Sequence, residues 1–232
     1  MNIRFIRKPV RHGLALAGLA LLASCGGDNR PAPLPPPPPP APPPPKLSIP
    51  PRPLPPDHAS PYLQVPPLLA SGLRYSVNRE ISPAQMTWNL RSAYNVAALN
   101  CHGPGHGEIV PSYRAFLKVH ARGLAAANRK VDSEFREKNG AKFIIPREKY
   151  MTEVYNHFAA PPTLPAFCDA IVAMGRDLKG VKPAELNAFA ARSLPAVEII
   201  FDDFYRRYAQ YQADLAAWES KYGPLINSRP NP

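Results

Sequence analysis

The sequence predicts an all-α fold: an irregular bundle of five or six helices that follows a proline-rich linker and ends in a long C-terminal helix. The strongest observation is the stretch from Pro195 to Tyr222, where large apolar residues alternate spacings of four and three. Residues at these spacings share one face of an α-helix. They are Val197, Phe201, Phe204, Tyr208, Tyr211, Leu215, Trp218 and Tyr222. A face this aromatic is expected to need partner helices, and no window alternates apolar and polar residues as a half-buried strand would.

Helix start and stop signals divide the rest of the domain. Ser82-Pro83-Ala84-Gln85 places Ser at an N-cap, Pro at the first helical position and Gln where a capping box needs it. This first helix ends before the glycine-rich loop at residues 102–107. Further helices are expected at Pro111–Lys138, Arg147–Phe158, Leu164–Leu178 and Pro183–Arg192, followed by the helix that begins at Pro195 and stops at Gly223-Pro224.

Proline is concentrated in one segment, because residues 31–56 hold 17 of the 33 prolines. Such a run favours polyproline II and acts as a semi-rigid spacer. A peptide ligand for an aromatic groove is the alternative. The domain organisation is therefore predicted as a signal peptide at 1–24, a proline-rich linker at 25–60, an extended arm at 61–81, an all-helical domain at 82–225 and a flexible tail at 226–232.

The N-terminus has a basic segment followed by a short apolar run from Leu14 to Leu22. This run is too short to span a bilayer as a helix, which indicates a signal peptide. Leu22-Ala23-Ser24-Cys25 resembles the lipobox of bacterial lipoproteins. The resemblance implies cleavage before Cys25, lipidation of that residue and membrane attachment through the lipid. Gly26, in place of the retention signal Asp, implies the periplasmic side of the outer membrane. An ordinary cleaved signal is the alternative.

Removing the signal takes away four basic residues and leaves 24 basic against 17 acidic residues, a net charge of +7. A basic exported protein meets anionic lipid head groups, lipopolysaccharide phosphates and acidic wall polymers rather than nucleic acid. The candidate surface for an anionic envelope polymer, or for another envelope protein, is one side of the second predicted helix. Its residues are Arg114, Lys118, Arg122 and Arg129. A solvated helix face is the competing interpretation.

Two cysteines lie on predicted buried faces. In an oxidising compartment Cys101 and Cys168 are expected to form a disulfide that clamps the first helix to the fourth. A catalytic or metal-binding thiol is the alternative. His102 and His106 beside Cys101 could supply zinc ligands, but no fourth ligand has recognisable spacing. The sequence lacks the Cys-x-x-Cys-His motif for covalent haem attachment, because Ala98 occupies the position of the first cysteine.

Three further side chains are candidate catalysts. His120 lies on an apolar helix face, where a hydrogen-bonded core histidine is more common than a catalytic one. Glu198 and Asp202 could form a glycosidase-like carboxylate pair. Because both are assigned to positions off the apolar seam, the sequence favours solvated ion pairs with arginines such as Arg206.

The nucleophile and metal motifs of common hydrolases are absent from the sequence. No catalytic residue, metal or cofactor is therefore assigned. One further pattern runs from Trp88 through Asn95–Cys101, Tyr113, His120, Tyr155 and Asn156 to Phe167 and Cys168. In these positions the domain looks like a family of exported bacterial proteins with no assigned activity. The expected function is that of a lipid-anchored binding or structural domain, and an envelope hydrolase acting on wall glycan or peptide is the alternative.

Overall fold

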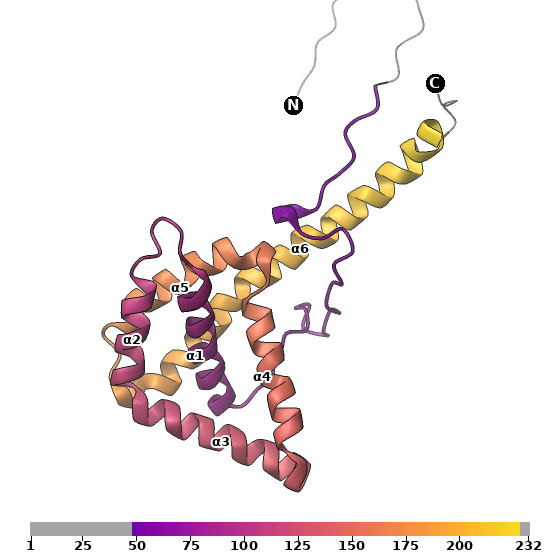
Figure 1. The fold of residues 1–232 in the computed structure, drawn as a ribbon. Coiled ribbons are helices and arrows are strands. Elements are labelled where there is room, and N and C mark those ends of the chain that lie inside the picture. The colour runs from indigo at the N-terminus through magenta and orange to yellow at the C-terminus, as the bar shows by residue number, and fades with distance from the viewer. Residues whose placement is uncertain (1–47, 228–232) are drawn as a thin grey trace, which may run out of the picture. The chain divides into compact units, whose positions relative to one another are not determined.

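The computed structural model describes residues 48–227, and this part of the chain contains six α-helices and no strand. The helices are α1 (Pro83–Asn100), α2 (Ile109–Val119), α3 (Ala121–Asn139), α4 (Ile144–Phe158), α5 (Leu164–Leu178) and α6 (Leu186–Asn227) (Figure 1). The all-α prediction is confirmed. The predicted bounds of α5 agree with the structure, and those of α1 and α4 differ from it by a few residues.

Helix α1 lies at the centre of the bundle and contacts each of the other five helices. Its N-terminus has the predicted capping box. The Gln85 N–H donates to Ser82 Oγ at 3.1 Å, and the Ser82 N–H donates to Gln85 Oε1 at 3.0 Å. Buried residues occur all around α1, and this is typical of a core helix. They include Thr87, Asn89, Leu90, Ser92, Ala93, Tyr94, Val96 and Ala97.

The predicted second helix is two helices, because the chain bends at His120. This residue is the C-cap of α2 and the N-cap of α3, with φ −102° and ψ 15°. Figure 1 shows that α2 and α3 meet at a corner. Gly123 in the first turn of α3 lies close to α6, where an added Cβ would stand 2.8 Å from Leu186 Cδ2. The bend therefore occurs where α3 packs closely against α6. The helical periodicity of the apolar residues gives no sign of the bend, because it continues through residue 120.

Helix α6 is a single helix of 42 residues with Pro195 and Pro224 inside it. At 1.5 Å per residue it is about 60 Å long. The predicted break before Pro195 and the predicted stop at Pro224 are both wrong. An internal proline costs a helix about 3 kcal/mol. The turns on both sides of Pro195 are held in the core by Phe189, Leu194 and Val197, all buried, and their packing opposes a break.

The aromatic seam of α6 is confirmed as a packing face, but only its first two residues belong to the main core of the helical bundle. Val197 and Phe201 belong to the main core, whereas Phe204, Tyr208 and Tyr211 form a second cluster. Residues 50–65, which we call the strap, cover this second cluster. Ala59 is buried in it, and Leu63 and Val65 pack against it. Figure 1 shows the strap running beside α6.

Polar contacts fix the strap along α6. The indole N–H of Trp218 donates to the Pro50 carbonyl at 2.9 Å, and Arg207 pairs with Asp57 at 2.6 Å. Residues 48–60 of the predicted linker therefore belong to the helical unit. The signal peptide, Cys25 and the remaining linker lie outside the described residues.

Tyr208 is the main polar contact between α6 and the strap, and its removal gives a testable prediction. Its hydroxyl donates to the Ser60 carbonyl at 2.7 Å and accepts from the Leu63 N–H at 3.1 Å. Tyr208→Phe leaves both backbone groups without this partner, and we expect a loss of about 1–3 kcal/mol in a urea unfolding measurement. Tyr222→Phe is the control, because no hydrogen bond of the Tyr222 hydroxyl occurs within residues 48–227. Equal stability of the two variants would contradict this role.

Within residues 48–227, no single helix is long and apolar enough to cross a membrane. Helix α4 and residues Pro161–Leu178 together are long and apolar enough to do so, but the two segments are bent by 44° relative to each other, and this judgement rests on length and composition only.

Candidate functional site

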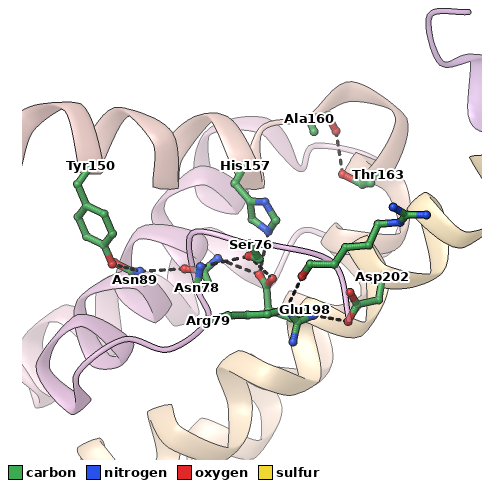
Figure 2. Close-up of polar contacts among 11 residues, drawn as sticks. Ser76, Asn78, Arg79, Asn89, Tyr150, His157, Ala160, Thr163, Glu198 and Asp202 are labelled. Atoms are coloured by element: carbon green, nitrogen blue, oxygen red, sulfur yellow. Dashed lines mark hydrogen bonds and ion pairs between the residues drawn. The ribbon is translucent and has the colours of Figure 1, made fainter. Parts of the chain in front are cut away.

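A buried carboxylate, Glu198 on α6, is the centre of the largest polar cluster in the described part of the chain. Its exposed fraction is 2%. Glu198 Oε2 accepts from Ser76 Oγ at 2.6 Å, and Oε1 accepts from Asn78 Nδ2 at 2.8 Å. His157 Nε2 on α4 also lies 2.8 Å from Oε1, and its ring stacks on Phe201 with centroids 3.9 Å apart. Figure 2 shows the side chains of Ser76, Asn78 and His157 converging on the carboxylate from two segments, residues 76–78 and α4.

The cluster continues into α1 through a buried amide. Asn89 Nδ2 donates to Asn78 Oδ1 at 2.8 Å and to the Tyr150 hydroxyl at 2.6 Å (Figure 2). Burial raises the pKa of Tyr150 to about 12, so this hydroxyl stays protonated at neutral pH. The connections join α1, α4 and α6 to residues 76–78, which follow the strap. The cluster therefore acts as a clamp between this part of the chain and the bundle.

Hydrogen bonding decides the ionisation state of Glu198. Burial alone raises the pKa of a carboxyl group, but the bonds from His157, Ser76 and Asn78 favour the charged form more strongly. The pKa of Glu198 is accordingly lowered. Glu198 is therefore a buried carboxylate that remains ionised because donors from other segments satisfy both of its oxygens.

The sequence-based assignment of Glu198 and Asp202 to solvated ion pairs with Arg206 is wrong. Glu198 is buried, and Asp202 pairs at 2.5 Å with Arg79, which lies 123 residues earlier in the sequence. Arg206 instead pairs with Asp203. The spacing did contain a signal, because Glu198 lies four residues after Leu194 and three before Phe201, in register with the core face.

The geometry of the Glu198 cluster suits support rather than nucleophilic catalysis. A Ser-His-acid arrangement needs the serine hydroxyl on the imidazole and the imidazole on the acid. Here Ser76 and His157 both bond directly to the Glu198 carboxylate. Ser76 and Glu198 are both buried, so a substrate could not reach the serine hydroxyl in this conformation.

Cys101 and Cys168 form a disulfide that joins the C-cap of α1 to α5, with Cα atoms 5.6 Å apart. The bridge removes Cys101 as a thiolate ligand. His102 Nε2 lies 2.8 Å from the Leu99 carbonyl, and His106 Nε2 lies 2.9 Å from Asp169 Oδ1. Within residues 48–227, no group of three histidine, cysteine or acidic residues could hold a metal ion.

His120 is buried, with an exposed fraction of 2%, and burial lowers its pKa. Burial agrees with the core interpretation, but the expected hydrogen bond is missing: Nδ1 has no partner among the described residues. His120 lines a cleft of about 440 Å³ between α2 and the end of α5. Glu108 lines the same cleft, but it lies twelve residues away along α2, which is about 18 Å. The two side chains therefore do not form an acid–base pair.

The four predicted anion-binding residues are all exposed. Arg114 and Lys118 lie on α2, whereas Arg122 and Arg129 lie on α3, so the bend at His120 divides the expected single face. Residues 109–131 contain five basic and no acidic residues. None of the four forms an ion pair within the described residues. We call these four side chains the basic corner.

Comparison with known proteins gives no match: no family model, curated protein or solved structure is significantly similar to this chain. The resemblance of the helical domain to a family of exported bacterial proteins therefore stays a prediction.

Proposed function

We propose that this protein is an outer-membrane lipoprotein whose helical domain binds an anionic component of the envelope from the periplasmic side. The observation that carries the binding role is the basic corner, four exposed cations without acidic partners among residues 48–227. The anchoring role rests on the lipobox pattern that ends at Cys25. Together these two features support a domain that is tethered near anionic lipids and polymers and presents exposed cations to them.

The distribution of charge supports this proposal. Many other cations of the domain are neutralised, for example Arg79 by Asp202, Arg176 by Glu108 and Arg207 by Asp57. The basic corner lies on a stretch that contains no acidic residue at all. Unpaired exposed cations favour an extended anionic surface, since they contribute long-range attraction without a pocket.

The hydrolase alternative finds little support in the geometry. His120 and Glu108 lie at opposite ends of one cleft, and both oxygens of Glu198 already accept hydrogen bonds inside the protein. A general acid–base pair must reach one reacting group together. A binding role requires no such convergence.

Charge reversal of the basic corner tests the binding role. We expect Arg114→Glu/Lys118→Glu/Arg122→Glu/Arg129→Glu to weaken binding of the detergent-solubilised full chain to immobilised lipopolysaccharide by about 100-fold or more. The reason is that each cation beside an anionic lipid surface contributes about 1 kcal/mol. Binding is measured across a salt series, because loss of the contacts should also flatten the salt dependence.

A matched control separates a local site from net charge. Lys138, Lys142, Lys149 and Lys221 are exposed and lie away from the basic corner in the sequence, and their reversal changes the net charge by the same amount. We expect this control to retain most of the binding. Equal weakening by the two sets of substitutions would contradict a specific role for the basic corner.

A further inference from the structure

The cleft between α2 and α5 is an elongated apolar site. Its walls come from Pro111, Ala115, Phe116 and Val119 on α2 and from Leu178 and Val181 at the end of α5 and just beyond it. It follows α2 from Glu108 to His120, a distance of about 18 Å. Its volume of about 440 Å³ lies in the range of roughly 300–1,000 Å³ that small-molecule sites occupy.

We propose that this cleft binds one long-chain fatty acid, with its carboxylate at the Lys179 end and its chain along α2. The length fits, because a bilayer core about 30 Å thick contains two acyl chains end to end, so one chain spans about 15 Å. The proposal is independent of the anchoring at Cys25 and of the basic corner.

The walls of the cleft provide the surface that an acyl chain needs. Phe116 and Leu178 are buried side chains that line it, and Val119 has an exposed fraction of 53% although it is apolar. Ligand pockets are lined mostly by apolar side chains, with a few polar groups that fix the orientation of the ligand.

Charge identifies the end that receives the head group. Arg176 Nη2 lies 2.5 Å from Glu108 Oε1, and Lys179 Nζ lies 3.6 Å from Glu108 Oε2. Two cations therefore share one carboxylate, and the local charge stays positive. The longer contact leaves Lys179, which also lines the cleft, able to pair with a second carboxylate. At the other end His120 lines the cleft, and burial lowers its pKa, so its ring stays neutral near pH 7; Lys118 and Arg122 lie nearby in the sequence but do not line the cleft.

Photocrosslinking of the full chain in a total cell extract, with soluble and membrane fractions kept together, tests the site. The probe is palmitic acid with a diazirine in its chain, and labelled peptides are mapped by mass spectrometry. We expect label on peptides that contain residues 109–119 and 174–181. Ala115→Trp fills the cleft from an exposed position and should reduce this label by about tenfold.

Ala125→Trp is the matched control, because Ala125 is also an exposed helical alanine and lies on α3 outside the cleft. It should leave the label unchanged. Label spread over the whole chain, or equal label in the two variants, would overturn the proposal. So would crosslinks from the cleft to a protein partner in place of the fatty acid.

The head group has its own test. Lys179→Glu should reduce label by the fatty acid about tenfold, and label by an alkylamine of equal length should increase. Lys138→Glu makes the same change of charge at an exposed site on α3 and should alter neither. If the alkylamine labels the unsubstituted protein as well as the fatty acid does, the assignment of an anionic ligand is wrong.

Discussion

Glu198→Ala should lower the free energy of unfolding by about 3–5 kcal/mol, because it removes one partner of a buried charged cluster. The substitution leaves Ser76 Oγ, Asn78 Nδ2 and His157 Nε2 without their acceptor. Small domains are stable by only about 5–15 kcal/mol, so this is a large fraction of the total. Urea unfolding followed by far-UV circular dichroism measures the loss.

The matched control is Glu219→Ala, a glutamate farther along the same helix. Glu219 pairs with Arg52, but both side chains are about half exposed. Exposed pairs contribute little, so this variant should unfold at the same urea concentration as the unsubstituted protein. A Glu198→Ala variant as stable as Glu219→Ala would contradict the role of the cluster as a clamp.

The same carboxylate predicts the direction of acid sensitivity. The folded state lowers the pKa of Glu198 below its ordinary value of 4.5, so in this range the unfolded chain binds more protons. The stabilisation is fully present above pH 4.5 and is lost as the pH falls through the folded-state pKa. In Glu198→Ala the free energy of unfolding should therefore decline less steeply below pH 4.5.

Removal of the disulfide should have a comparable effect. Cys101 and Cys168 are separated by 67 positions, and closing a loop of this length stabilises a fold by about 4 kcal/mol in the chain-entropy model. We expect Cys101→Ala/Cys168→Ala to lose about this amount in urea unfolding. A reducing agent should lower the stability of the unsubstituted protein and leave the double variant unchanged.

Thiol counting supplies the control for this prediction. Cys25→Ser leaves both residues of the bridge in place and should not change the stability of the helical domain. Alkylation of the unfolded, unreduced Cys25→Ser chain should find no free thiol. Two free thiols in this experiment would show that the bridge does not form in the protein as expressed.

The sequence predicts individual helices well where local chemistry defines their ends. The capping box at Ser82 and Gln85 defines the start of α1, and the bounds of α5 follow from its apolar pattern and flanking residues. Prediction fails where tertiary packing overrides a local rule. His120 matches the helical period, yet the chain bends there, and Pro195 carries a helix-breaking signal inside a continuous helix.

The Glu198 cluster is hard to predict from the sequence for a different reason. Its partners lie far away in the sequence: His157 is 41 residues from Glu198, and Asn78 is 120 residues away. The position of the strap also cannot be predicted from sequence patterns, because a proline-rich segment has no periodicity to indicate which helix face it covers. Only the four-and-three spacing of Leu194, Glu198 and Phe201 could have indicated a buried carboxylate.

Attachment through Cys25 is the central claim about this protein, and metabolic labelling with palmitate tests it most directly. We expect the unsubstituted chain to incorporate the label and to fractionate with the outer membrane. Cys25→Ser, which keeps Cys101 and Cys168, should incorporate none. An unlabelled wild-type chain, or a Cys25→Ser chain that still carries palmitate, would contradict the claim.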